Sequence, residues 1–165
     1  MINLIAAIDL NSALGHENEL LVKLPKDLKR FKELTTNQIC VFGRKTYQSI
    51  GFPLPDRKTI VITRDSEFKA PEGVEVYDSL EYVLYKYGRN ELFICGGSEI
   101  YNQSLQYADR IYLTVIDHTF PKADAHFPKF DISNWEVVEH EKYEADEKHP
   151  YGYSFVTYER KKNNK

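Results

Sequence analysis

The sequence predicts a single α/β domain whose mixed, mostly parallel sheet carries helices on both faces and an antiparallel hairpin at its C-terminal end. Short apolar runs alternate with helical segments along most of the chain. Most of these runs are apolar throughout, which is typical of strands covered on both faces. With 165 residues, 42% of them hydrophobic, the chain is long enough for one compact domain. We place that domain over residues 1–160 and expect 161–165 to form a frayed basic tail.

The predicted strands are short and rich in β-branched and aromatic residues. They span residues 2–8, 38–42, 59–63, 74–77, 91–95 and 110–116. Two later segments, 135–145 and 151–160, alternate apolar and polar residues on either side of a turn around Pro150 and Gly152. Such alternation favours an antiparallel pair with one face open to water.

The predicted helices lie between the strands, at residues 25–34, 44–50, 78–88 and 98–105. The third has apolar residues at helical spacing, namely Leu80, Val83, Leu84 and Tyr87. Asp78 with Glu81 predicts a capping box at its start, and Gly88 stands where a C-cap belongs.

Charge and composition narrow the function classes. There are 22 basic and 25 acidic residues, a net charge of −3, so the chain lacks the bulk positive field on which non-specific nucleic-acid binding depends. No apolar run has the length of a membrane span, and the N-terminus does not resemble a signal peptide, so we expect a cytoplasmic protein that binds no membrane. Cys40 and Cys95 lie in apolar runs and are interpreted as unpaired thiols, and the five histidines show no spacing typical of a metal site.

One acidic residue shares the apolar face of the first helix. Pro25 suits the first helical position, and helical numbering puts Asp27 on the same face as Leu28 and Phe31, with Arg30 largely turned away. An acid in the first turn can simply complement the helix dipole. A carboxylate beside apolar neighbours can also be a tuned acid that makes paired hydrogen bonds to an amidine-like ring edge.

Three strand ends carry groups that favour anions. Each strand is followed by residues that could hold a phosphate at a helix start or a strand end. The residues are Gly43, Arg44, Lys45 and Thr46 after the second strand, Thr63 and Arg64 after the third, and Gly96, Gly97, Ser98 and Glu99 after the fifth. Any one of these turns could be an ordinary solvated connection. Together they indicate a phosphorylated nucleotide lying across the edge of the sheet.

A stiff turn precedes the third strand. Pro53, Pro55 and Asp56 limit its conformations and would hold Arg57 in a fixed direction, where it could bind a carboxylate in bidentate fashion. The alternative is an ordinary surface arginine.

In the order in which they occur, the segments LIAAID, LPKDLKRFKELT, FGRKTYQSIGFPLPDRKTIVITR, ICGGSEIY, IYLTVID and DAHFP resemble dihydrofolate reductases nearly from end to end. The resemblance implies an eight-stranded sheet and a monomeric enzyme that uses NADPH to reduce 7,8-dihydrofolate to 5,6,7,8-tetrahydrofolate. It also implies that Asp27 binds the pterin ring with support from Thr114, and that Arg57 holds the carboxylate of the glutamyl tail.

The resemblance assigns the remaining site residues as well. The substrate would be lined by Ile5, Leu28, Phe31, Ile50, Leu54 and Cys95. The nicotinamide would be bordered by Ala7, Leu14, Gly15 and Asn18. The adenosine phosphates would be taken by Arg44, Lys45, Thr46, Thr63 and Arg64, and the pyrophosphate would lie against Gly96, Gly97, Ile100 and Tyr101.

One departure concerns proton delivery. Where the family usually has Leu-Pro-Trp, this chain has Leu20, Leu21 and Val22, so the indole that holds an ordered water over the pterin is missing. Two other readings stay open: a reductase of the same fold that acts on a ribosylated pyrimidine in riboflavin synthesis, and a nucleotide-binding protein without turnover. Asp27 and Arg57 favour the folate reading, since a sugar phosphate needs neither.

Overall fold

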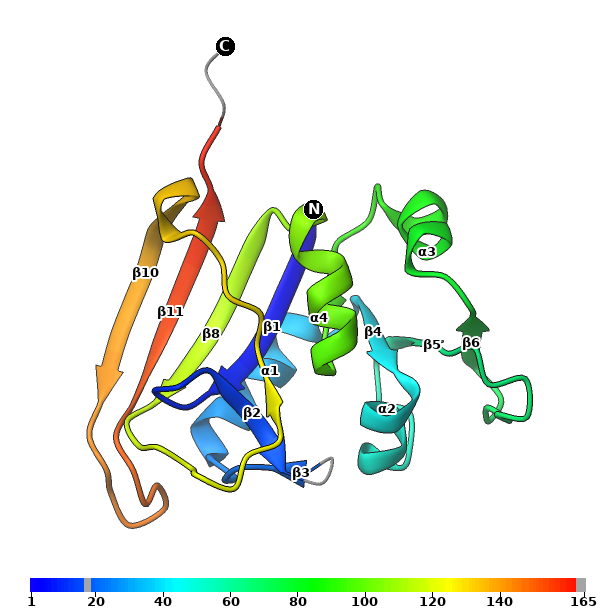
Figure 1. Cartoon of the computed structure of the whole chain (residues 1–165). Coiled ribbons are helices and arrows are strands. Elements are labelled where there is room, and N and C mark those ends of the chain that lie inside the picture. Colours follow the sequence, from blue (N-terminus) through cyan, green and yellow to red (C-terminus); the bar gives the residue numbers. More distant parts are fainter. Residues whose placement is uncertain (17–18, 163–165) are drawn as a thin grey trace.

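The computed structural model, which describes residues 1–16 and 19–162, confirms the α/β architecture and the eight-stranded, mostly parallel sheet (Figure 1). The strands of that sheet are β1 (Ile2–Ile8), β4 (Ile39–Gly43), β5 (Lys58–Ile62), β6 (Val74–Tyr77), β7 (Leu92–Ile94), β8 (Arg110–Ile116), β10 (Trp135–Tyr143) and β11 (Tyr153–Arg160). Their order is β10, β11, β8, β1, β7, β4, β5, β6. All neighbours from β8 to β6 are parallel, whereas β11 is antiparallel to both β8 and β10. Every predicted strand is present, with boundaries shifted by at most a few residues.

Helices cover both faces of the sheet, as predicted. They are α1 (Pro25–Thr35), α2 (Arg44–Ile50), α3 (Leu80–Tyr87) and α4 (Ser98–Ser104), with short 3₁₀ turns η1 (Leu105–Tyr107) and η2 (Ile132–Asn134). Figure 1 shows α4 in front of the sheet and α1 behind it. Val83 of α3 and Ile100 of α4 pack into one apolar cluster with Leu4 of β1. On the opposite face Leu34 of α1 and Tyr47 of α2 pack in a second cluster around β4 and β7. Within the described residues no helix has the length and apolar character needed to cross a bilayer.

A small second sheet was not predicted from the sequence. Its strands are β2 (Ala13–His16), β3 (Glu19–Leu20) and β9 (Ala125–His126), with β2 in the middle. Two of them have only two residues, too few to produce a periodic pattern. Buried Asp9 supports this region, because its carboxylate accepts backbone hydrogen bonds from Asn11, Ala13 and Phe120 at 2.8–2.9 Å. Burial acts to raise the pKa of Asp9, but these hydrogen bonds outweigh it and the pKa is lowered.

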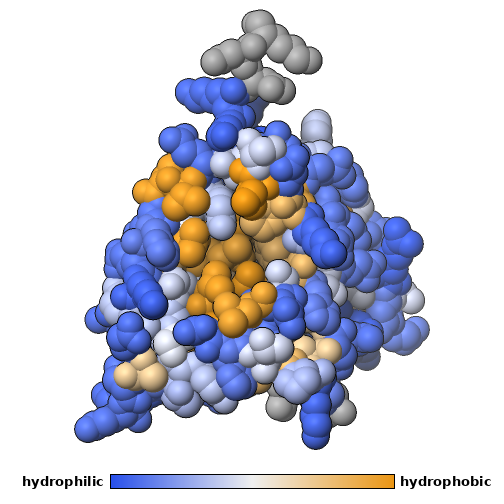
Figure 2. Space-filling model, turned by 60° about the vertical axis from the view of Figure 1, so that its left-hand side comes forward, coloured by the Kyte–Doolittle hydropathy of each residue, from blue (hydrophilic) through white to orange (hydrophobic). Residues whose placement is uncertain are grey.

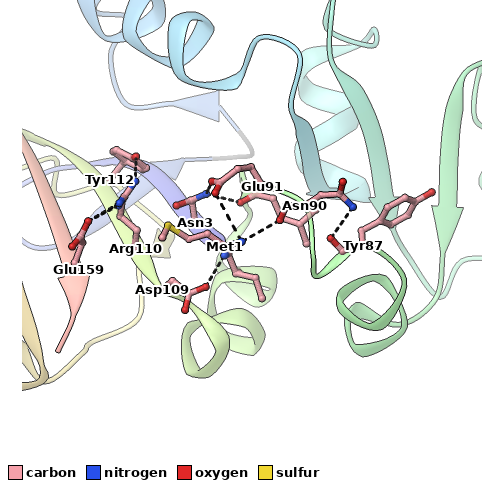
Figure 3. Close-up of polar contacts among 11 residues, drawn as sticks. Met1, Asn3, Tyr87, Asn90, Glu91, Asp109, Arg110, Tyr112 and Glu159 are labelled. Atoms are coloured by element: carbon pink, nitrogen blue, oxygen red, sulfur yellow. Dashed lines mark hydrogen bonds and ion pairs between the residues drawn. The ribbon is translucent and has the colours of Figure 1, made fainter. Parts of the chain in front are cut away.

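The start of the central strand β1 is anchored by polar contacts (Figure 3). The amino group of Met1 donates a 3.2 Å hydrogen bond to the carbonyl of Asn90 and lies 3.9 Å from Glu91. The side chain of Asn3, which is fully buried, donates to Glu91 Oε2 at 2.8 Å. These contacts fix β1 against the segment that leads into β7.

Strand β10 forms one edge of the sheet, and Figure 2 turns that side toward the viewer. Apolar side chains gather in the middle of this view and are surrounded by hydrophilic ones. Val137 and Val138 of β10 are exposed, and the pairing with β11 shifts register between Val137 and Glu139. Such a bulge, together with the charges of Glu136 and Glu141, discourages pairing with a further strand.

The predicted C-terminal tail follows β11 directly. The backbone N–H of Lys161 donates a 2.9 Å hydrogen bond to the carbonyl of Asn134. Residues 163–165 of the tail lie outside the described residues.

The start of α3 corrects one prediction. Ser79, not Asp78, is the N-cap: it has an extended backbone, and its hydroxyl accepts a 3.3 Å hydrogen bond from the N–H of Tyr82. Because the helix begins one residue later than predicted, the cap shifts by one residue, and the N–H that is satisfied is that of Tyr82 rather than that of Glu81. Gly88 is the C-cap, as predicted.

Replacing Ser79 with alanine should therefore lower the free energy of unfolding by about 1 kcal/mol, because it removes this cap. A thermal unfolding scan should show a fall in Tm of about 2–4 °C for a chain of this size. Asp78→Ala is the control and should cost much less. An equal loss in the two variants would argue against Ser79 as the cap.

Candidate active site

Asp27 lies in the first turn of α1 and faces the sheet. The helix begins at Pro25, after Leu24 in an extended conformation. Asp27 is partly buried, and the hydroxyl of Thr114 on β8 donates a 2.5 Å hydrogen bond to its Oδ1. Burial raises the pKa of Asp27, while the Thr114 hydrogen bond and the charge of Arg30 act in the opposite direction. The carboxylate is thus desolvated and held in place, as a tuned acid must be.

The prediction that Arg30 is largely turned away from the protein is wrong. Only 15% of its side chain is exposed. Its guanidinium lies 4.3 Å above the ring of Phe155, donates to the Thr157 hydroxyl at 3.2 Å and forms an ion pair with Glu139. The reason is that α1 lies across β8 and β11, whose residues on this face are aromatic or polar rather than aliphatic, so a cation can be buried there. No spacing rule pairs Arg30 with Phe155, Thr157 or Glu139, so the sequence carried no signal of this burial.

The apolar residues assigned to the substrate come from four parts of the chain. Leu28 and Phe31 follow Asp27 on α1, Ile5 is on β1, Ile50 ends α2 and Leu54 lies in the loop after it. Ile5, Ile50 and Leu54 pack against the same buried cluster. Leu28 remains 45% exposed and the other four side chains are only partly buried. This region therefore presents apolar surface that a flat ligand could cover.

The two cysteines lie closer together than their sequence separation suggests. Cys40 on β4 is fully buried, whereas Cys95, just after β7, is only partly buried. The Cys95 thiol donates a 3.4 Å hydrogen bond to the carbonyl of Phe93. Burial, followed by the nearby Cys40 thiol, raises the pKa of the Cys95 thiol well above its usual range. Cys95 is therefore a neutral, weakly polar side chain beside the apolar residues named above.

Arg57 is oriented by two neighbours. Its Nε donates to the carbonyl of Pro55 at 2.9 Å, and Nη1 donates to the hydroxyl of buried Thr35 at 3.2 Å. Thr35 is in turn fixed by a 2.7 Å hydrogen bond to the carbonyl of Phe31. Five N–H donors are available on a guanidinium, so the second terminal nitrogen stays available for a carboxylate.

The two glycine turns lie side by side. The N–H of Gly43 donates a 2.7 Å hydrogen bond to the carbonyl of Gly96. A Cβ on Gly97 would stand 2.9 Å from Oγ1 of Thr46, closer than a packed contact allows. Gly96 has a φ of 111°, in the region that favours glycine. The predicted pair of backbone turns is thus one continuous surface that a phosphate could approach closely.

The tyrosine of α4 connects this surface to the central strand. Tyr101 is buried and its hydroxyl donates a 2.6 Å hydrogen bond to the carbonyl of Ile5. Ile100 is also buried, while Ser98 is partly exposed and Glu99 exposed. Nearby residues of the predicted nicotinamide site, Ala7, Leu14 and Gly15, are buried or partly buried on β1 and β2, and Asn18 lies outside the described residues.

The predicted phosphate cations include one with an acidic neighbour. Arg44 starts α2, donates to Gln48 at 3.0 Å and lies 3.8 Å from the carboxylate of Asp65. Lys45 and Arg64 are exposed, and Thr46 and Thr63 partly so. The sequence predicted the cations of these segments but not the role of Asp65, because no spacing rule pairs Asp65 with Arg44.

Comparisons with known proteins all give the same family description. A family model described as dihydrofolate reductase matches residues 1–160. The chain is 46% identical to the dihydrofolate reductase of Bacillus subtilis (strain 168), covering 100% of this chain and 98% of that protein. It is 38% identical to the dihydrofolate reductase of Staphylococcus aureus (strain Mu50 / ATCC 700699), covering 98% and 99%. A solved dihydrofolate reductase from Enterococcus faecalis, complexed with NADP(H) and RAB-propyl, superposes with a TM-score of 0.91 at 38% identity, covering 98% of this chain and 97% of that one.

Proposed function

The chain belongs to the dihydrofolate reductase family, whose enzymes reduce dihydrofolate with NADPH, and on this premise we propose that Asp27 binds and polarises the pterin ring. The observation that carries the proposal is the partly buried Asp27 carboxylate, held by Thr114 beside an apolar surface. A carboxylate in that setting can accept two hydrogen bonds from the amidine edge of the pterin. Asp27 would thereby orient the ring, and its negative charge would polarise the ring for the reduction.

The glycine turns and the cations around them fit the cofactor. A Cβ at Gly97 would clash with Oγ1 of Thr46, so only glycine lets these two segments lie this close, and we assign the pyrophosphate to the backbone of these turns. We assign the 2′-phosphate to Arg44 and Arg64, which favours NADPH over NADH. When bound, NADPH supplies the hydride, and the protein supplies alignment and electrostatics.

The remaining substrate contacts follow from the same geometry. Leu28, Phe31, Ile50 and Leu54 would cover the flat part of dihydrofolate, and Arg57 would bind the carboxylate of its glutamyl tail. We propose that a water molecule admitted to the site delivers the proton that N5 of the substrate gains. Asp27 acts by orienting and polarising the ring. General acid–base assistance of this type contributes on the order of 10²–10⁴ in rate.

The assay is the loss of NADPH absorbance when dihydrofolate is added. A dihydrofolate reductase should oxidise NADPH when dihydrofolate is added. A reductase of riboflavin synthesis would oxidise NADPH only with a ribosylated pyrimidine, and a nucleotide-binding protein without turnover would oxidise it with neither compound.

We further propose a monomer that acts in the cytoplasm, and sedimentation should then give a mass near 19.3 kDa.

Arg30 should tune the ionisation of Asp27. Because its charge lowers the pKa of Asp27, Arg30→Gln should raise that pKa, so that the protonated fraction of Asp27 is larger at any given pH. The transition that Asp27 contributes to the pH profile of kcat/KM should move to higher pH. Lys29→Gln is the control, since Lys29 is 76% exposed on the same helix, and it should leave the profile in place. An unmoved profile in Arg30→Gln would show that Glu139 neutralises the charge of Arg30, so that Arg30 does not tune Asp27.

Val22 should make proton delivery differ from that of relatives with tryptophan at this point. Val22 is partly buried and packs against a cluster that contains Leu24 and Ile116, where it cannot hold a water by hydrogen bonding. We expect Val22→Trp to raise the rate or to change its pH dependence, measured over a range of pH at saturating NADPH. If both stay as they are, Val22 does not limit proton delivery.

A further inference from the structure

Helix α1 begins without a cap from its own segment. Leu24 occupies the N-cap position and makes no side-chain hydrogen bond to the first turn, whose N–H groups have no partners within the helix. The loop between β10 and β11 supplies the acceptor instead. Nε2 of His149 accepts a 3.1 Å hydrogen bond from the backbone N–H of Lys26. Lys26 directly precedes Asp27, so this contact holds the turn that carries the carboxylate.

His149 is itself buried and oriented. Only 6% of the residue is exposed, and its ring centroid lies 5.0 Å from that of Tyr153. Oδ1 of Asp146 is 2.8 Å from Nδ1 and also accepts the backbone N–H of His149 at 2.9 Å. Because Lys26 donates to Nε2, that nitrogen carries no proton, and the ring proton is on Nδ1, from which it is donated to Asp146. The hydrogen bond from His149 is the main cause of the lowered pKa of Asp146.

Among the residues that the structure describes, three charged or titratable groups contact this imidazole or lie beside it. They are Asp146 on its own loop, Tyr153 on β11, and Lys26 on α1, whose ammonium is drawn 3.6 Å above the ring of Tyr143. None of them replaces the acceptor that the first turn needs. The carboxylate of Asp146 is 59% exposed, so it serves to orient the ring rather than to bind anything in the active site.

We propose that His149 is a positioning residue for the reductase: its neutral imidazole, oriented by Asp146, caps α1 from across the fold and keeps Asp27 where it meets the pterin. The inference rests on the proposed function of Asp27. His149 lies 123 residues from Lys26 in the sequence, and the contacts of its ring given above, to Lys26, Asp146 and Tyr153, include no residue assigned to a ligand.

The test replaces His149 with leucine, which removes the acceptor and keeps the site apolar. We expect the Lys26 amide to exchange with solvent roughly 5- to 30-fold faster by NMR, as a lost helix cap implies. We expect kcat/KM for dihydrofolate to fall by roughly 10-fold, because a small displacement of an orienting group costs rate, while NADPH affinity is unchanged. His149→Gln keeps an acceptor and should restore both quantities. His140→Leu, at an exposed position of β10, is the matched control and should change neither.

Two additional variants keep the result decisive. Asp146→Ala, at an exposed position, should move both quantities in the same direction if His149→Leu does not fold. In an Asp27→Asn background, His149→Leu should have no further effect on kcat/KM. Unchanged exchange at Lys26 would overturn the cap, and an equal rate loss in both backgrounds would overturn the link to Asp27. If Asp27→Asn alone keeps full turnover, the proposed function fails instead, and the exchange data distinguish that case.

Discussion

Replacing Asp27 with asparagine should lower kcat/KM for dihydrofolate by roughly 10²–10³ at neutral pH, the range lost when one preorganised group that stabilises charge is removed from an active site. Asparagine has the same shape and can still accept the Thr114 hydrogen bond, but it cannot carry the charge that polarises the pterin. The transition that Asp27 contributes to the pH profile should disappear in this variant. NADPH affinity should stay as in the parent, since no cofactor contact is assigned to Asp27. Turnover at the parental rate would contradict the assignment.

Stability gives a control for the same variant. The pKa of Asp27 is raised in the folded protein, mainly by burial, so folding favours its protonated form. Its contribution to stability is therefore fully present below the unfolded-state pKa and is lost as pH rises through the folded-state pKa. At neutral pH the parent must bury a charged carboxylate, which costs stability, whereas asparagine is uncharged. Asp27→Asn should therefore have at least the parental Tm at neutral pH. A lower rate together with an unchanged or higher Tm would show that the loss is chemical and not a folding defect.

The sequence predicted the parts of the site that depend on one segment each. Asp27 follows from helical numbering after Pro25, and the turns at Gly43 and Gly96 follow from glycines placed directly after apolar strands. Parallel strands bring such turns to the same edge of a sheet, and the 2.7 Å hydrogen bond between Gly43 and Gly96 shows that they meet there.

What the sequence did not predict depends on contacts between distant segments. The cap from His149 to Lys26, the ion pair of Arg44 with Asp65, and the burial of Arg30 against Phe155 join residues that share no local pattern. Arg30 shows the limit most clearly, because a charged residue on an amphipathic helix is ordinarily assigned to the solvent face. The burial of Arg30 depends on which residues β8 and β11 present to α1. The helical periodicity of α1 contains no information on those residues.

Replacing Arg57 with glutamine should raise KM for dihydrofolate by roughly 10- to 100-fold, because a hydrogen-bonded contact to a charged group contributes about 1.5–3 kcal/mol. The carboxylate that it binds is remote from the reacting ring and is held equally in the ground state and the transition state, so kcat at saturating substrate should change little. Arg57→Lys should recover only part of the affinity, since an ammonium cannot form the bidentate contact.

A substrate analogue without the glutamyl tail tests whether this effect runs through the carboxylate. The guanidinium of Arg57 also donates to the carbonyl of Pro55 and to the hydroxyl of Thr35, the last residue of α1. Loss of Arg57 could therefore instead disturb the helix that carries Asp27. In the first case parent and Arg57→Gln should reduce the tailless analogue with the same kcat/KM. In the second case the variant should lose activity on both substrates in equal proportion, and Arg57 would then be a structural support of α1 rather than the residue that recognises the tail.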